Sequence, residues 1–107
     1  MPDYYLGEFE QLVTFALARL GDEAYGVTIR QTLASHIGRQ PSLGAIYSTL
    51  RRLEEKGLVR SWQGEPEAVR GGRAKKFVAL TPRGQAALRE AHRAVVRMAE
   101  GVRGLQR

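Results

Sequence analysis

Residues 41–59, PSLGAIYSTLRRLEEKGLV, decide the fold because they predict a helix with a defined start and a defined end. Ser42 can accept a hydrogen bond from a free backbone amide of the first turn, and Gly57 is typical of a helix stop. Apolar side chains recur between these two residues at spacings of three and four, so one face of the helix is expected to lie on a core. These side chains are Leu43, Ile46, Tyr47, Leu50 and Leu53.

The opposite face of this helix carries small, hydroxyl and basic side chains, namely Ala45, Ser48, Thr49, Arg52 and Lys56. A helix in the major groove of DNA needs short side chains near the bases and cations within reach of the phosphates. The pattern therefore predicts a recognition helix. Taken alone, it is equally typical of an amphipathic helix with a solvated, charged face.

A β-hairpin is predicted after the helix, because residues 58–63 and 75–81 are strand-like. The segment between them contains the tip Arg70, Gly71, Gly72 and Arg73. The two glycines keep the tip narrow, while its arginines, together with Lys75 and Lys76, supply cations that can read a narrow minor groove. A surface hairpin kept soluble by its charge is the alternative. Following a basic helix, the hairpin favours the layout of a winged helix.

The net charge of +6 is unevenly distributed along the chain. Residues 1–50 carry three basic and five acidic side chains, whereas residues 51–107 carry fourteen basic and six acidic ones. The basic half begins on the predicted recognition helix, so one side of the molecule is expected to meet a polyanion with an affinity that falls as salt rises. Charge alone does not choose between DNA, RNA and an anionic membrane.

Other function classes find little support in the sequence. The chain has no cysteine, and His36 and His92 lie on different predicted helices without metal-ligand spacing. No nucleophile motif or phosphate-binding loop is present, so we expect no enzyme activity, metal or cofactor. No apolar run reaches the roughly 18–20 residues that span a bilayer, and the start MPDYYLGEFE lacks the basic region of a signal peptide. These features favour a cytoplasmic protein without a membrane partner.

Two helices are predicted before the recognition helix, over about residues 6–20 and 25–37, with Gly21 and Gly38 as their stops. The apolar stripe of the first helix is wide enough for two packing partners. Helix, short turn and helix form the pair that braces a recognition helix.

A last helix is predicted to start at Thr81 and Pro82 and to run nearly to the end of the chain. Its apolar side chains follow a heptad pattern: Leu88, Ala91, Val95, Met98, Val102 and Leu105. A long terminal helix has little core of its own to cover, so the pattern favours pairing with a second chain. A helix folded back on its own domain is the alternative. We expect a mainly α fold with a small β-hairpin (α+β), in which residues 1–81 form a winged helix-turn-helix domain and residues 82–107 a dimerisation helix.

Five motifs occur in a fixed order, namely LGEFEQLV, AYGVTIRQTL, SLGAIYSTLRRLEEKGLV, RGGRAKKF and LTPRG. With them, the sequence resembles the PadR family of bacterial transcriptional regulators over roughly three quarters of its length. The resemblance implies a homodimeric winged helix-turn-helix repressor that binds an inverted repeat in promoter DNA. It also implies that the first and last helices form the dimer interface.

The resemblance assigns residues to each of these surfaces. The recognition-helix positions are Ser42, Gly44, Ala45, Tyr47, Ser48, Thr49, Arg51 and Arg52, and the charge pattern adds Lys56. The wing positions are Gly71, Gly72, Arg73 and Lys75, with Arg70 beside them. The dimer interface takes Leu6, Phe9, Leu12 and Phe15 from the first helix and the heptad residues from the last.

Several assignments stay open at this point. The ring of Tyr47 lies on the apolar stripe, while its hydroxyl could reach a phosphate. Gly44 fits either close approach of the backbone to DNA or tight packing on the preceding helix. Trp62 is interpreted as a sheet-packing residue rather than a ligand platform. A small-molecule effector at the dimer interface stays open, and the sequence does not indicate its chemical class. The alternative function is a winged helix that binds protein or RNA without a DNA operator.

Overall fold

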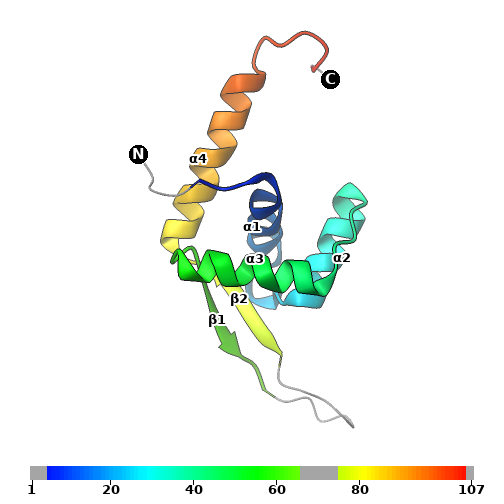
Figure 1. The fold of residues 1–107 in the computed structure, drawn as a ribbon, viewed down its shortest axis with the longest axis vertical. Coiled ribbons are helices and arrows are strands. Elements are labelled where there is room, and N and C mark those ends of the chain that lie inside the picture. Colours follow the sequence, from blue (N-terminus) through cyan, green and yellow to red (C-terminus); the bar gives the residue numbers. More distant parts are fainter. Residues whose placement is uncertain (1–4, 66–74, 106–107) are drawn as a thin grey trace.

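The fold consists of three packed helices, a two-stranded hairpin and a long final helix, and the computed structural model describes residues 5–65 and 75–105 of it. In chain order the elements are α1 (Glu8–Leu20), the 3₁₀ turn η1 (Gly21–Glu23), α2 (Gly26–Ile37), α3 (Leu43–Glu55), β1 (Val59–Gln63), β2 (Lys76–Leu80) and α4 (Pro82–Ala99). In Figure 1, α3 crosses the middle of the molecule in front of α1. The hairpin extends below α3, and α4 rises above it. The expected α+β fold class is confirmed.

The helix boundaries follow local capping signals. The Ser42 hydroxyl accepts a hydrogen bond from the Ala45 amide at 3.0 Å, and the Thr81 hydroxyl accepts one from the Gly84 amide at 3.0 Å. Gly38 ends α2 with a φ of 67°, a left-handed conformation that favours glycine. These three predicted boundaries are confirmed.

The core lies between α1, α2, α3 and the base of the hairpin. Each of these parts contributes at least one aliphatic side chain that is almost fully buried, and the largest are Val13, Ile29, Ile46, Leu53 and Leu58. Burial of one such side chain contributes about 1.5–3 kcal/mol to stability. The core therefore fixes the orientation of α3 relative to the other helices.

The hairpin is anchored at its base to the loop that precedes α2. The Val78 amide donates a hydrogen bond to the Ala24 carbonyl at 2.9 Å. Trp62 lies opposite Phe77 in the antiparallel register, and their rings stack with centroids 5.9 Å apart. Phe77 in turn meets the Tyr25 ring edge-on at 5.5 Å. An isolated two-stranded hairpin is only marginally stable, so the hairpin depends on these contacts for its stability. Trp62 thus packs on the sheet.

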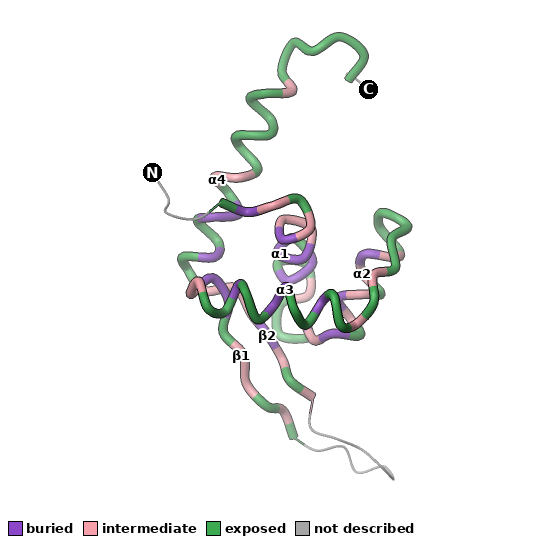
Figure 2. Tube along the Cα trace, in the orientation of Figure 1, coloured by how far each residue is buried: buried purple, intermediate pink, exposed green. Residues whose placement is uncertain are grey.

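Only the first turns of α4 pack on the rest of the chain. A Cβ atom added at Gly84 would overlap the backbone oxygen of Leu58, so glycine permits the close crossing of α4 over the start of β1. Ala87 and Leu88 are buried, whereas all residues from 92 to 98 are exposed, as the green upper half of α4 in Figure 2 shows. None of the described helices has the length and apolar character needed to cross a membrane.

The expectation that α4 runs nearly to the end of the chain was wrong. The helix ends at Ala99, and Val102 and Leu105 lie beyond it. The chain turns away from the helix axis at Gly101, and both this residue and Gly104 have positive φ angles, of 75° and 92°. The helical part of the heptad pattern therefore stops at Met98.

Candidate nucleic-acid interface

The outer face of α3 carries a small residue, a hydroxyl and a guanidinium in succession. Gly44, Ser48 and Arg51 are exposed and lie on the side of the helix opposite the buried Ile46 and Leu53. Low bulk at the start of a helix, followed by polar side chains, suits entry into a major groove. Glu54 and Glu55 are also exposed, so the cationic part of this face ends at Arg51.

Thr49 does not belong to this face. It was expected among the outward residues, but it is 1% exposed and lies on the core side of α3 with Ile46 and Leu53. Its hydroxyl accepts a hydrogen bond from Nη2 of Arg52 at 3.1 Å. Its assignment to the DNA surface was wrong, because a position beside an apolar stripe is buried when two neighbouring elements pack on that side.

Tyr47 contacts α2 and remains partly exposed. A Cβ atom added at Gly26 would overlap the Tyr47 hydroxyl oxygen, so the tip of the ring rests on the first residue of α2. The side chain is nevertheless 43% exposed. The packing role expected for the ring is thus met by α2, and a contact between the hydroxyl and a phosphate stays a prediction.

A groove of about 240 Å³ runs between α3 and the hairpin. Arg51 and Lys76 line it from the two sides, and both are exposed. Neither cation has an ion-pair partner among residues 5–65 and 75–105. The Ser61 hydroxyl donates a hydrogen bond to Glu54 at 2.9 Å, which ties β1 to α3 beneath the groove. α3 and the hairpin are thereby held together, with Arg51 and Lys76 on opposite sides of the groove.

The strands of the hairpin carry further cations next to aromatic rings. The Arg60 guanidinium lies 4.8 Å from the centroid of the Trp62 ring, and the Lys75 ammonium lies 4.8 Å from that of Tyr25. Such contacts attract a cation to the face of a ring. The predicted tip residues Arg70, Gly71, Gly72 and Arg73 fall outside the described residues.

Arg52 and Lys56 lie on the flank of α3 that faces α1. The Lys56 ammonium is 3.2 Å from Oε2 of Glu10, and Nε of Arg52 is 3.8 Å from the same oxygen. The Glu10 side chain is 11% exposed. Two of the three basic side chains of α3 that the sequence assigned to DNA are therefore engaged within the protein.

Glu10 was not identified from the sequence, although a signal was present. It lies four residues after Leu6 and three before Val13, which places a carboxylate on the apolar stripe of α1. Carboxylates at such positions are almost never buried without a partner. The spacing therefore indicated that Glu10 forms a buried ion pair, but it did not indicate which cation is the partner.

The residues assigned to the dimer interface fall into two groups. Leu6 and Leu88 are buried in their own chain, and Phe9, Leu12 and Ala91 are partly buried against its core. The others are exposed, at 37% for Phe15, 54% for Val95, 79% for Met98, 42% for Val102 and 63% for Leu105. Most of the exposed apolar surface assigned to the interface therefore belongs to this second group.

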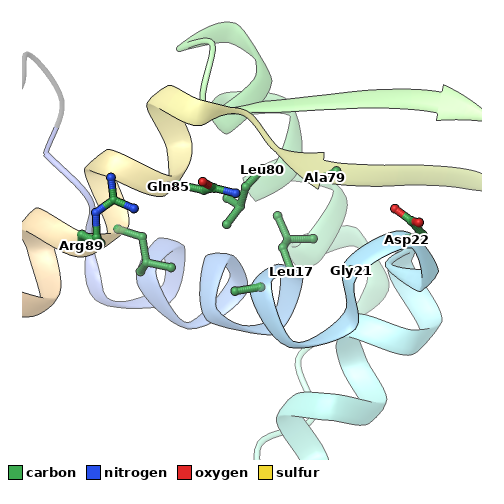
Figure 3. A pocket seen from close by; sticks show the side chains of 9 residues that line it. Leu17, Gly21, Asp22, Ala79, Leu80, Gln85 and Arg89 are labelled. Carbon is green, nitrogen blue, oxygen red and sulfur yellow. The ribbon is translucent and has the colours of Figure 1, made fainter.

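A second groove, of about 350 Å³, lies between the end of α1, β2 and the start of α4. Figure 3 shows the apolar side chains of Leu17 and Leu80 between Arg89 at one end and Asp22 at the other. It lies within one chain, and an effector at the dimer interface stays a prediction. Among the residues that the structure describes, no three His, Cys, Asp or Glu side chains are arranged to hold a metal ion.

The chain is similar to known transcriptional regulators in both sequence and fold. The family described as "Transcriptional regulator PadR-like family" matches residues 16–90. "Transcriptional regulator Rv3488" of Mycobacterium tuberculosis (strain ATCC 25618 / H37Rv) is 41% identical over 85 residues, which cover 79% of this chain and 75% of that protein.

Two solved structures of PadR family proteins share the fold. That of the PadR family transcriptional regulator from Eggerthella lenta DSM 2243 has a TM-score of 0.70 at 29% identity and covers 88% of this chain and 81% of its own. That of the regulator from Clostridium difficile R20291 has a TM-score of 0.66 at 25% identity, with coverages of 87% and 95%.

Proposed function

Because the chain belongs to the PadR-like family of transcriptional regulators, we propose that it binds an inverted repeat in double-stranded promoter DNA as a homodimer and represses transcription in the cytoplasm. One observation carries the proposal. The exposed row of Gly44, Ser48 and Arg51 on α3 adjoins a groove whose other wall presents Lys76. A polar helix face beside a basic hairpin has the shape and the charge to follow a groove and its phosphate wall.

In this proposal the α3 residues have separate roles. Ser48 and Arg51 face base edges in the major groove, where arginine can bind guanine through two hydrogen bonds. Lys76 and Lys75, at the end of the strands nearest the tip, contact phosphates. The tip residues Arg70, Gly71, Gly72 and Arg73 are proposed to enter the adjacent minor groove, where the negative potential attracts arginine.

The homodimer is supported by the exposed side chains of α4. Val95 and Met98 are the most accessible apolar residues of the helix, at 54% and 79%, and Phe15 of α1 is also exposed. Apolar side chains in a row on a helix that makes few contacts with its own chain are typical of a helix that pairs. A dimer must also hold its two recognition helices roughly 34 Å apart to meet successive major grooves.

Footprinting on the DNA upstream of the gene for this protein tests the proposal. At about 150 mM salt, which screens non-specific contacts, we expect protection of two inverted half-sites. The Arg51→Ala variant serves as the control and should lose the protection while remaining folded. Absence of protection at every concentration and at all promoters tested would favour a protein-binding or RNA-binding winged helix instead.

A further inference from the structure

We propose that Glu10 limits the affinity of the DNA-binding site for the DNA backbone, because it withholds Arg52 and Lys56 of α3 from DNA phosphates. The inference rests on the proposed function. Its basis is the position of one carboxylate between two helices: Oε1 of Glu10 accepts a hydrogen bond from the Gly7 amide at 3.0 Å, and Oε2 faces both cations. Both oxygens of a largely buried carboxylate are thus engaged.

Burial makes these contacts harder to break than ion pairs on the surface. The side chain of Glu10 is 11% exposed, that of Lys56 32% and that of Arg52 54%. A cation that leaves Glu10 for a phosphate leaves behind a carboxylate that little water can reach. DNA must therefore compete with Glu10 for each of the two cations.

The orientation of Arg52 supports the same conclusion. Nη2 of Arg52 donates to the buried Thr49 hydroxyl at 3.1 Å, so its guanidinium lies along the flank of α3. Arg52 nevertheless follows Ser48 by about one helical turn, which places its stem beside the outer face. Once released from Glu10, this side chain would be in reach of the DNA backbone.

Withholding cations lowers non-specific binding more than base recognition. Non-specific affinity depends on the number of phosphates that are neutralised, and each one contributes roughly 0.9 to the slope of log affinity against log salt. Base contacts made by Ser48 and Arg51 do not depend on Glu10. Withholding two cations therefore removes a larger share of the non-specific than of the specific binding free energy.

The test is a salt titration with a random-sequence DNA duplex, which requires no knowledge of the operator. For Glu10→Gln we expect a slope steeper than that of the wild type by roughly 0.9 for each cation released. Lowering salt from 200 to 50 mM should then tighten binding by roughly 3.5-fold more than in the wild type for each such cation. Glutamine keeps an oxygen that can accept the hydrogen bond from Gly7.

Glu8→Gln is the matched control. It changes the net charge by the same amount in the same turn of α1, but Glu8 is an exposed residue that pairs with Arg39 at 3.4 Å and with no residue of α3. We expect the wild-type slope for this variant. Adding Lys56→Gln to Glu10→Gln should take back roughly 0.9 of the increase in slope, because the released ammonium is then absent.

The outcomes separate the two proposals. A wild-type protein that binds no duplex overturns the proposed function and this inference with it. Wild-type binding with a Glu10→Gln slope that is unchanged, or no steeper than that of Glu8→Gln, overturns this inference alone. Should Glu10→Gln fail to fold, Lys56→Gln and Lys76→Gln in the wild-type background decide: Lys56→Gln is expected to reduce the slope by less than Lys76→Gln, whose cation is proposed to contact a phosphate, and equal reductions would overturn the inference.

Discussion

Replacing Gly44 by alanine is expected to stabilise the protein while weakening its binding to DNA. Gly44 is the second residue of α3, and a Cβ atom added there would meet only Oγ of Ser42, at 3.9 Å, an ordinary van der Waals contact. Tight packing on α2, one of the two explanations suggested by the sequence, is thus ruled out. Alanine in a helix is more stable than glycine by about 0.5–1 kcal/mol, which in a domain of this size raises the Tm by roughly 2–8 °C.

The loss of DNA affinity follows from the place of Gly44 on the outer face of α3. If the helix backbone approaches the DNA there, an added methyl group forces either the helix or the DNA to move. The resulting strain of about 1–3 kcal/mol weakens binding by at least about fivefold. Thermal unfolding and operator binding measured on the same preparation provide the two readouts. Ala86→Gly, at an exposed position of α4, is the control and should lower the Tm without changing binding. A Gly44→Ala variant that is more stable and binds DNA as well as the wild type would refute close approach at this residue.

Three further changes test other parts of the structure. Gly84→Ala should destabilise the protein by about 1–3 kcal/mol despite its helical position, because the methyl group meets the Leu58 backbone oxygen; a Tm equal to or above that of the wild type contradicts this packing. Met98→Asp should give monomers in analytical ultracentrifugation, since a charge would enter the proposed dimer interface, and an unchanged dimer would place that interface elsewhere. Arg73→Ala should reduce the salt slope by roughly 0.9, and an unchanged slope would argue against a phosphate contact by the wing tip.

Features set by neighbouring residues could be predicted from the sequence. The caps at Ser42 and Thr81 and the glycine stop at Gly38 depend on backbone groups within a few residues, and all three are present. The order of helices and strands follows from such signals and from the spacing of apolar side chains. The end of α4 was misjudged because the heptad pattern continues past Gly101, where the backbone leaves the helix.

Features that depend on distant residues could not be predicted. Thr49 and Arg52 lie at the edges of the apolar stripe of α3, where burial is decided by how closely α1 packs. Glu10 and Lys56 are 46 residues apart in the chain, and no local pattern pairs them. The sequence thus indicated which helix carries the candidate site, whereas the structure shows which of its cations are free to contact DNA.

The stacking of Trp62 on Phe77 gives the protein an intrinsic optical reporter. Trp62 is the only tryptophan of the chain, and it lies on β1 toward the tip of the hairpin, with the Arg60 guanidinium over its ring. The emission of an indole depends on the polarity and the charge immediately around it, so a change in fluorescence on adding DNA reports on the hairpin and not on α3. Stopped-flow measurements of this signal, compared with those of a dye attached to the DNA, can therefore time the arrival of the wing separately from that of the recognition helix.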